Sequence, residues 1–568
     1  MIKSRPILLF ILLFFSLATY SQDKDKEKIV KLDGSLGMYY DGYSYDVSNY
    51  TSFRPRNPSD LLRLNFNANI SIGKYLSIPF GINITNQKTS YNLPNIPEEN
   101  LFSYVRNPRN NIHIDPKYKW MQFHLGSHTP NYSPLTTGDI QIFGAGVEIN
   151  PGKFILSANY GKSQLAIEPD PILNIGGAYD QKIIGMQVGV GKLEKSRFVL
   201  NFIKIEDDVF SVINKPIGID PITGITVSPL LELKIANKIT FSTETAGSIY
   251  TSNLNASAFT FTESYFSTIS NFVELNSSSK IDFSHTSSIQ YAAKTFSLGG
   301  EVRYIGPGFM PVGYRNIEKD IIDYKLNGGL KLFKNKFNIK GTFGVRTNNI
   351  KNTKLQSTER IIGNVNIYAQ LSKKFSVNAN YNNYSFGNNE SNNLIRIDMI
   401  NNSFSLTPTY QIQAKAANHI LSANISNISF EQFDVSANGF TNTLSKSYNA
   451  NYMLILKNNP LTVGFTGLYL ENQSPITNLN LLNFNSTIGY KLFKKKLTPS
   501  LMIGYSIIDK DIYTADKRIN LKLKCMYKIT KKLDFNLAYS LNNYRYGSYR
   551  PDGLLTENMF QLSLLQKL

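Results

Sequence analysis

Two histidines, His124 and His128, are the residues whose type and spacing most directly suggest chemistry. Imidazoles four residues apart, followed downstream by Asp139, could bind a metal ion if they projected from one face of a helix. The alternation of the residues around them instead predicts a strand through His124 that ends in a loop near His128, so the two rings need not converge. The sequence therefore predicts no metal site at this pair.

Two other groups have the composition of an ion site. Glu206-Asp207-Asp208 supplies carboxylate oxygens that could bind calcium or bridge lipopolysaccharide through cations, but its position suits a solvated loop entry. Gly144-Ala145-Gly146 lacks the following helix of a phosphate-binding loop, and its glycines suit close packing or a bend in a strand. The five histidines show no Ser-His-Asp ordering. We therefore expect no enzyme, and the sequence assigns no catalytic, cofactor-binding or metal-binding residue and no cofactor.

The elements that carry these residues are strands with one apolar and one polar face. Between Lys532 and Asn542 the odd positions are apolar and the even positions are mostly polar. Successive side chains of a strand point to opposite faces, so the segment has one apolar and one polar wall. Similar alternation runs over Leu62–Ile72, Phe337–Arg346 and Phe375–Asn382. A soluble sandwich would bury the apolar wall against a second sheet, whereas a membrane barrel turns it toward lipid.

The start of the chain favours the membrane. A basic beginning, the apolar run Ile7–Leu17 and a suitable cleavage site at Thr19-Tyr20-Ser21 predict a secretory signal peptide. The apolar run is shorter than the roughly 20 residues of a spanning helix, and no longer run follows it. An exported membrane protein without such helices must be a barrel. We expect a signal peptide over residues 1–21 and one barrel domain over residues 22–568.

Composition agrees with strands that are apolar on one face only. Hydrophobic residues make up 42% of the chain and the mean hydropathy is −0.21. Aromatic residues reach 12%, with 34 Tyr, 35 Phe and one Trp, and the Tyr ring suits a membrane–water interface. The single cysteine, Cys525, excludes an intramolecular disulfide and fits a small strand residue.

The formal charge of +19, from 60 basic and 41 acidic residues, raises the question of nucleic acid. The lysines do not gather on one helix or patch, because they recur in short turns, for example at Lys74, Lys334 and Lys531. Long basic side chains at a barrel rim can extend to the interface, and docking of an acidic periplasmic partner is the alternative. Nucleic acid is excluded because export takes the chain away from it.

The short turns predict the size of the barrel. If all of them face the periplasm together with both chain ends, they imply roughly 26 strands, with about 22 to 26 as the expected range. Alternation of apolar and polar residues is poorest in the strand expected between Phe102 and Ile114, and it is also weak in the first strand, near Lys31–Asp41. The twelve turns are centred near Lys74, Pro116, Gly152, Glu194, Asn237, Lys294, Asn335, Lys373, Ala416, Asn458, Lys495 and Lys531.

The long connections then lie outside the cell. The most conspicuous are Lys88–Phe102, Phe210–Val227, Thr251–Lys280 and Phe386–Met399. A barrel this wide leaves a large aqueous lumen unless loops or a partner fill it. Aromatic residues make the Thr251–Lys280 loop partly apolar, so it either folds inward or packs on itself. The sequence thus predicts an all-β fold, a single large antiparallel transmembrane β-barrel with short periplasmic turns and long extracellular loops.

The last residues fit a strand that closes the barrel. Phe560, Leu562, Leu564 and Leu568 alternate to the end of the chain. This pattern is similar to the C-terminal signal that the barrel assembly machinery of outer membranes recognises, although Leu568 stands where an aromatic residue is usual.

Four motifs within residues 115–154 carry a resemblance to known proteins. They are Asp115-Pro116-Lys117-Tyr118-Lys119-Trp120, His124-Leu125-Gly126, Asn131-Tyr132-Ser133-Pro134-Leu135 and the run Gly144–Phe154. This stretch resembles a group of poorly characterised outer-membrane β-barrel proteins of the Bacteroidota. The resemblance implies a Gram-negative cell outer membrane, with outer-membrane lipids and lipopolysaccharide around the barrel. It supplies no catalytic residues.

Three functional classes follow from these observations. The first is a porin-like channel or transport protein whose polar, net basic lumen, lined by residues such as Arg63, Asn65, Lys340 and Arg346, would favour anions. The second is a non-enzymatic barrel subunit of a larger outer-membrane secretion or uptake assembly, with a plug or a periplasmic partner subunit. A surface adhesin and a barrel hydrolase rank below these. A TonB-dependent receptor is disfavoured because the residues after Gln22 leave no room for a plug domain.

Overall fold

The computed structural model describes most of the chain. The predicted signal peptide, Lys88–Phe102 and the aromatic stretch Phe259–Phe266 lie outside the described residues. In the described part of the chain, no helix has the length and apolarity that crossing a bilayer requires. The described residues are 29–49, 53–86, 111–171, 175–192, 195–258, 269–311, 317–388, 390–437, 439–511, 513–547 and 553–568.

Twenty-seven strand segments form one continuous sheet. Their bounds are β1 (Val30–Ser48), β2 (Asp60–Ile72), β3 (Leu76–Thr85), β4 (Asn111–Ile114), β5 (Lys117–Tyr118), β6 (Met121–His128), β7 (Ile142–Ile149), β8 (Phe154–Gln164), β9 (Asp180–Gly191), β10 (Arg197–Asp208), β11 (Thr223–Ile235), β12 (Ile239–Thr251), β13 (Ser279–Ala292), β14 (Phe296–Ile305), β15 (Ile321–Leu332), β16 (Phe337–Asn348), β17 (Glu359–Gln370), β18 (Phe375–Gly387), β19 (Asp398–Gln413), β20 (Ala417–Asp434), β21 (Gly439–Leu456), β22 (Leu461–Gln473), β23 (Leu479–Tyr490), β24 (Leu497–Lys510), β25 (Tyr513–Lys528), β26 (Leu533–Arg545) and β27 (Leu554–Lys567).

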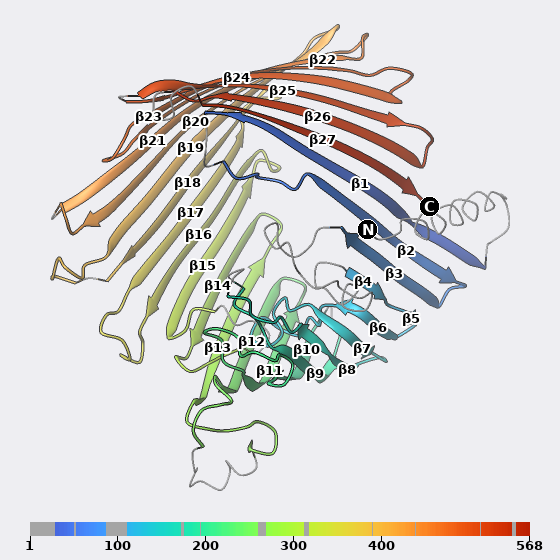
Figure 1. Cartoon of the computed structure of the whole chain (residues 1–568), viewed down its shortest axis with the longest axis vertical. Coiled ribbons are helices and arrows are strands. Elements are labelled where there is room, and N and C mark those ends of the chain that lie inside the picture. The colour runs from blue at the N-terminus through green and yellow to red at the C-terminus, as the bar shows by residue number, and fades with distance from the viewer. Residues whose placement is uncertain are drawn as a thin grey trace.

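The sheet closes on itself because its first and last strands pair. β1 and β27 run antiparallel, from Ser35 opposite Lys567 to Ser48 opposite Leu554, and Figure 1 shows the two side by side. Between β3 and β6, the segments β4 and β5 follow one another as parts of a single strand. The 27 segments therefore occupy 26 positions in a closed antiparallel barrel. The predicted fold class and strand number are confirmed, and the alternating C-terminal residues do form the closing strand.

The connections at one end of the barrel are all short, and both described chain ends lie at that end. Several of their residues have left-handed backbone conformations, with φ of 57° at Lys334, 67° at Asn335 and 66° at Gly152. Tight hairpin connections often need such angles, and glycine and asparagine adopt them most readily. The predicted turns fall on these connections except at Pro116, and Glu194 itself lies outside the described residues.

The turn predicted at Pro116 is wrong. Pro116 lies between β4 and β5, inside an interrupted strand, and the chain reverses at Lys119 and Trp120. Proline has no N–H for the ladder, so it interrupts pairing here without reversing the chain. Pairing continues on both sides, because Asp115 N donates to Pro79 O and Phe123 N donates to Pro116 O. The weakly alternating strand sought between Phe102 and Ile114 begins, within the described residues, at Asn111.

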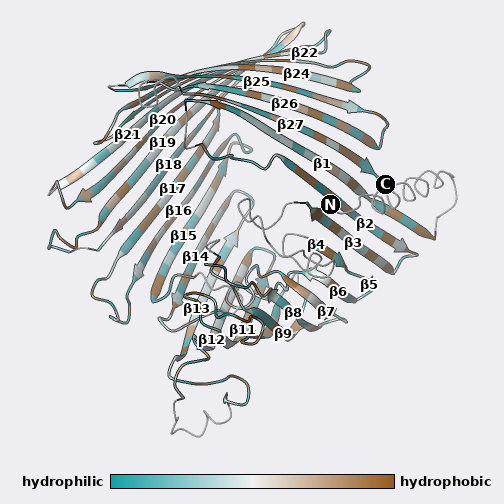
Figure 2. Cartoon of the chain, viewed as in Figure 1, coloured by the Kyte–Doolittle hydropathy of each residue, from teal (hydrophilic) through white to brown (hydrophobic). Residues whose placement is uncertain are grey.

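Apolar and polar residues alternate along the strands, as the banded colours of Figure 2 show. Large apolar side chains on one face are strongly exposed, with Leu326 at 59% and Phe343 and Phe484 at 52% each. Soluble monomers rarely expose a continuous apolar surface of this extent. The outward face of the barrel is therefore an apolar belt, and the polar positions turn inward.

Gly144 marks a close approach between two strands. It lies opposite Gly161, with β7 and β8 paired antiparallel. A Cβ atom at Gly144 would collide with the carbonyl oxygen of Tyr160 and with the Cα of Gly161. The close-packing interpretation is confirmed at Gly144, where backbone occupies the space, whereas the atoms nearest to a Cβ at Gly146 belong to the side chains of Asn159 and His128.

We expect Gly144→Ala to destabilise the barrel by about 1–3 kcal/mol, the usual cost of forcing extra atoms into a packed site. The measurement is the temperature at which the folded band on an unheated denaturing gel converts to the unfolded band. Gly247→Ala on β12 is the matched control, because a Cβ there meets nothing within 4 Å. Equal transition temperatures for the two variants would contradict the contact.

Candidate functional site

The inward face of the wall is identified by the loops that touch it. Asn159 on β8 donates from Nδ2 to the hydroxyl oxygen of Tyr132 in loop 129–141, at 2.6 Å. Ser248 on β12 accepts from the backbone N–H of Met310 in loop 306–311, at 3.0 Å. Residues that are paired across neighbouring strands point to the same side, so the strand register identifies the inward residues on every other strand. The lumen is thus the face that carries Asn159 and Ser248.

Loop 129–141 folds into the lumen. Tyr132, Ser133, Leu135, Thr136 and Thr137 are all buried, although they belong to a connection rather than a strand. Burial raises the pKa of the Tyr132 hydroxyl, so this group stays protonated at neutral pH. The loop therefore forms part of the inner structure of the barrel.

A buried carboxylate ties this loop to the wall. Oε1 of Glu244 on β12 accepts hydrogen bonds from Ser133 in the loop and from Ser228 on β11. Glu244 is 6% exposed. An acidic side chain at that depth needs such donors, because a buried polar group without partners costs about 1–3 kcal/mol. The three residues join two strands and the inward loop at one point.

Apolar contacts complete the packing on this side of the lumen. Ile183, Ile203 and Ile205 form a buried cluster with Ile142, and Met310 packs against it. A second cluster joins Leu135 of the inward loop to Ala246, Ile305, Phe309 and Ile321. This sector, from β7 to β15, is consequently a packed core inside the barrel. The sequence carries a signal for it, because Phe198–Ile205 is apolar on both faces and not only on the outward one.

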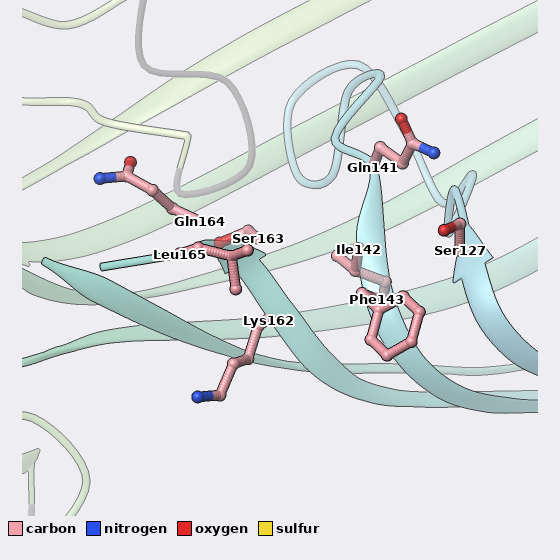
Figure 3. A pocket seen from close by; sticks show the side chains of 8 residues that line it. All are labelled: Ser127, Gln141, Ile142, Phe143, Lys162, Ser163, Gln164 and Leu165. Carbon is pink, nitrogen blue, oxygen red and sulfur yellow. The ribbon is translucent and has the colours of Figure 1, made fainter. Parts of the chain in front are cut away.

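A small cavity lies at the edge of the packed sector. Figure 3 shows its lining from the ends of β6, β7 and β8, including Ser127, Gln141, Ser163 and Gln164. Its volume is about 20 Å³. A cavity of that size holds about one water molecule. It is therefore too small for a solute.

Histidines gather on the inward face beside the packed sector, and this was missed from the sequence. His113 Nδ1 lies 2.6 Å from one carboxylate oxygen of Asp115, and His124 Nδ1 lies 2.8 Å from the other. His124 Nε2 is 3.4 Å from Glu148. The His124 and His128 rings stack with centroids 5.2 Å apart. The two rings do converge, which the strand prediction did not require, because β6 carries both on its inner face.

These histidines form a hydrogen-bonded cluster with two carboxylates and an amide. Their ring nitrogens contact Asp115, Glu148 and Asn159, and the Asn159 side-chain oxygen lies 2.8 Å from His128 Nε2. Among the described residues, no three His, Cys, Asp or Glu side chains are placed to hold a metal ion. Asp139, which the spacing offered as a third ligand, is exposed in loop 129–141.

The acidic group Glu206-Asp207-Asp208 does not converge. Asp207 points inward and accepts from Gln181 Nε2 at 2.6 Å. Glu206 faces outward beside Lys204, at 2.8 Å, and Asp208 pairs with Lys182 at 3.4 Å. Alternation along β10 separates neighbouring carboxylates onto opposite faces, so no shared cation site forms.

All four residues predicted to line the lumen lie on the inward face. Arg63 donates to Asp41 at 2.6 Å, and Asn65 lies two positions further along β2. Arg346 on β16 donates two hydrogen bonds, of 2.6 and 2.8 Å, to the carboxylate of Asp323 on β15. Lys340 lies on the same face of β16 as Arg346 and is exposed. Arg63 and Arg346 are therefore paired with carboxylates, whereas Lys340 has no ion pair among the described residues.

We expect Glu244→Ala to release loop 129–141 from the wall. The change leaves the Ser133 and Ser228 hydroxyls without their acceptor, which should raise local opening by roughly tenfold or more. The measurement is the rate of maleimide labelling of Thr136→Cys, a fully buried position, in a Cys525→Ser background.

The matched control for this loop is Glu301→Ala, since Glu301 is a wall carboxylate that pairs with Arg303 at 3.2 Å. Its labelling rate should equal that of the parent. Unchanged labelling in Glu244→Ala as well would show that the apolar contacts alone hold the loop.

No protein-family model matches the chain, and no curated protein matches its sequence. Among solved structures, the translocation pore of the P pilus usher PapC is similar over 94% of this chain and 99% of its own, with 9% identity and a TM-score of 0.34. BauA, the ferric preacinetobactin receptor of Acinetobacter baumannii, is similar over 94% and 80%, with 9% identity and a TM-score of 0.36. OccAB3 of Acinetobacter baumannii covers 65% and 98%, with 11% identity and a TM-score of 0.31. All three TM-scores lie below 0.5, so the fold rests on the chain's own strand pairing.

Proposed function

We propose that the protein is a porin-like channel or transport barrel of a Gram-negative outer membrane. One observation carries the proposal: a closed barrel turns an exposed apolar belt outward and a polar wall inward. A closed sheet leaves no backbone group unpaired in lipid, which is the condition for a sheet to span a bilayer. The resemblance of residues 115–154 to outer-membrane barrels of the Bacteroidota agrees with this location.

The ends of the barrel suggest its orientation. Outer-membrane barrels place short turns in the periplasm and longer loops outside the cell. The short connections and both described chain ends share one end here, and loops 129–141 and 306–311 enter from the other. The inward loops therefore narrow the lumen from the extracellular side.

Charge inside the barrel favours anions. Lys340 on β16 and Lys522 and Lys524 on β25 project inward, and none of them has an ion pair among the described residues. Inward acidic groups are largely engaged, as Asp41 is with Arg63 and Asp323 with Arg346. Unpaired lysines in a water-filled lumen attract anions and repel cations. The charge that the lumen offers to a permeating ion is therefore net basic, because the unpaired groups are lysines and the carboxylates are largely paired.

A barrel subunit of a larger outer-membrane assembly is the second candidate, and one observation favours it. Loop 209–222 exposes Phe210 by 92% and Ile213 by 93%. The loop is nevertheless held in place, because the backbone N–H of Ile213 donates to Glu168 at 2.6 Å. Fixed apolar side chains in water are typical of a surface that a partner covers.

We expect the purified protein to give stable, anion-preferring conductance in a planar bilayer. Changing Lys340, Lys522 and Lys524 together to Gln should lower the anion-to-cation permeability ratio severalfold, because each lysine contributes positive potential along the lumen. Lys446→Gln is the control, since Lys446 points outward between Asn427 and Glu471.

The same preparation separates the two candidate functions. A silent bilayer, together with a stoichiometric subunit that co-purifies in mild detergent, would overturn the channel and support the assembly. In that case Phe210→Ser with Ile213→Ser should release the subunit without unfolding the barrel, since both side chains are solvent-exposed.

A further inference from the structure

One sector of the inner wall, formed by β18 to β23, carries almost no charge. The strand register places Asp398, Glu431, Lys446 and Glu471 of these strands on the outward face. Only Asp434, at the loop end of β20, has inward register, and it caps the following turn by accepting from Ser436 N at 2.7 Å. Within the described residues, the inward positions of this sector are otherwise uncharged.

Amides and hydroxyls take the place of charge there. Asn378 on β18 accepts from Asn366 at 2.9 Å, and Asn380 donates to Ser405 on β19 at 3.4 Å. Across β20 and β21, Ser426 and Ser447 lie 2.7 Å apart. On β23, Asn483 donates to Ser506 at 2.6 Å. The side chains form cross-strand ladders that hold one another in place along the wall.

The ladders leave hydrogen-bonding capacity free. An asparagine side chain has two donors and an oxygen with two lone pairs, and the ladder contacts use only part of these. Asn378, Asn380 and Asn449 are half-buried, in contrast to Asn159 and Asn201 in the packed sector, which are 7% and 0% exposed. The remaining donors and acceptors therefore face the lumen.

The solute that fits this surface has matching chemistry. A hydroxyl group donates and accepts, as the wall does, and a neutral solute loses no ionic hydration when it exchanges water for wall contacts. Ions gain nothing from an uncharged wall, and the free lysines that would attract them lie on β16 and β25, outside this sector. Fixed amides spaced along several strands suit a solute with many hydroxyls better than a single small one.

We propose that the β18–β23 wall is a binding path for neutral, hydroxyl-rich solutes of the oligosaccharide class. The inference deepens the proposed channel and rests on it for the route by which the solute moves. Binding of the solute needs only the wall, so binding and conduction can be tested separately.

Maltohexaose is the probe, because it is neutral and rich in hydroxyls. Saturation-transfer NMR on the detergent-solubilised full chain should report its binding, and the same sugar should reduce open-channel current in a planar bilayer in a concentration-dependent way. Tetraglycine with an acetylated amino end and an amidated carboxyl end is neutral, so it serves as a hydrogen-bonding solute without hydroxyls and should give a weaker response in both measurements.

Asn380→Leu combined with Asn449→Leu removes inward amides at nearly constant volume. It should weaken both responses by roughly tenfold, the effect expected for the loss of one or two hydrogen bonds. Asn383→Leu is the matched control, since Asn383 lies on the outward face of β18, where it pairs with Asn402 at 2.6 Å. Folding of each variant is checked by the heat-dependent gel shift.

The outcomes distinguish the two proposals. Current without any sugar binding overturns the inference and leaves the channel standing. Sugar binding in a barrel that never conducts overturns the channel and leaves the binding path standing. Equal responses to maltohexaose and tetraglycine, or equal loss in Asn383→Leu, would show a wall without preference for hydroxyls and overturn the inference.

Discussion

The pairing of β1 with β27 is the contact on which the rest of the structure depends. An open sheet of this length would present two rows of unpaired N–H and C=O groups, which neither lipid nor a soluble monomer tolerates. Closure removes both edges and at the same time defines an inside and an outside. Because side chains alternate along each strand, this division decides whether a given strand residue faces the outside or the lumen.

Closure with 26 strands creates its own problem, since wall side chains cannot fill so wide an interior. Within the described residues, loops that fold inward fill part of this width, most extensively on one side. Loop 129–141 and Phe309 pack against β7–β15, and Glu244 anchors the loop. The facing sectors keep polar side chains, which satisfy each other through ion pairs or amide ladders. The interior is thus partly a packed core and partly a polar wall.

Period-two alternation and turn chemistry suffice to predict the fold, because both act between residues close in sequence. The twelve-turn count and the closing residues Phe560–Leu564 follow from them. The histidine cluster does not, because Asp115 reaches His113 and His124 only after β4 and β6 are placed by register. Loop 129–141 also escapes prediction, since its anchor Glu244 lies more than a hundred residues away.

The sequence charge of +19 is a poor guide to the field inside the barrel. Many lysines lie in the turns at the rim, where water and salt screen them within about a nanometre. Along the wall, Arg63, Arg303 and Arg346 each face a carboxylate and contribute little beyond that pair. The potential along the lumen is therefore set by a few free lysines beside an uncharged amide wall. Such an interior attracts anions at these lysines and presents no electrostatic barrier to a neutral solute along the β18–β23 wall, so in the proposed binding path hydrogen bonding rather than charge decides what that wall retains.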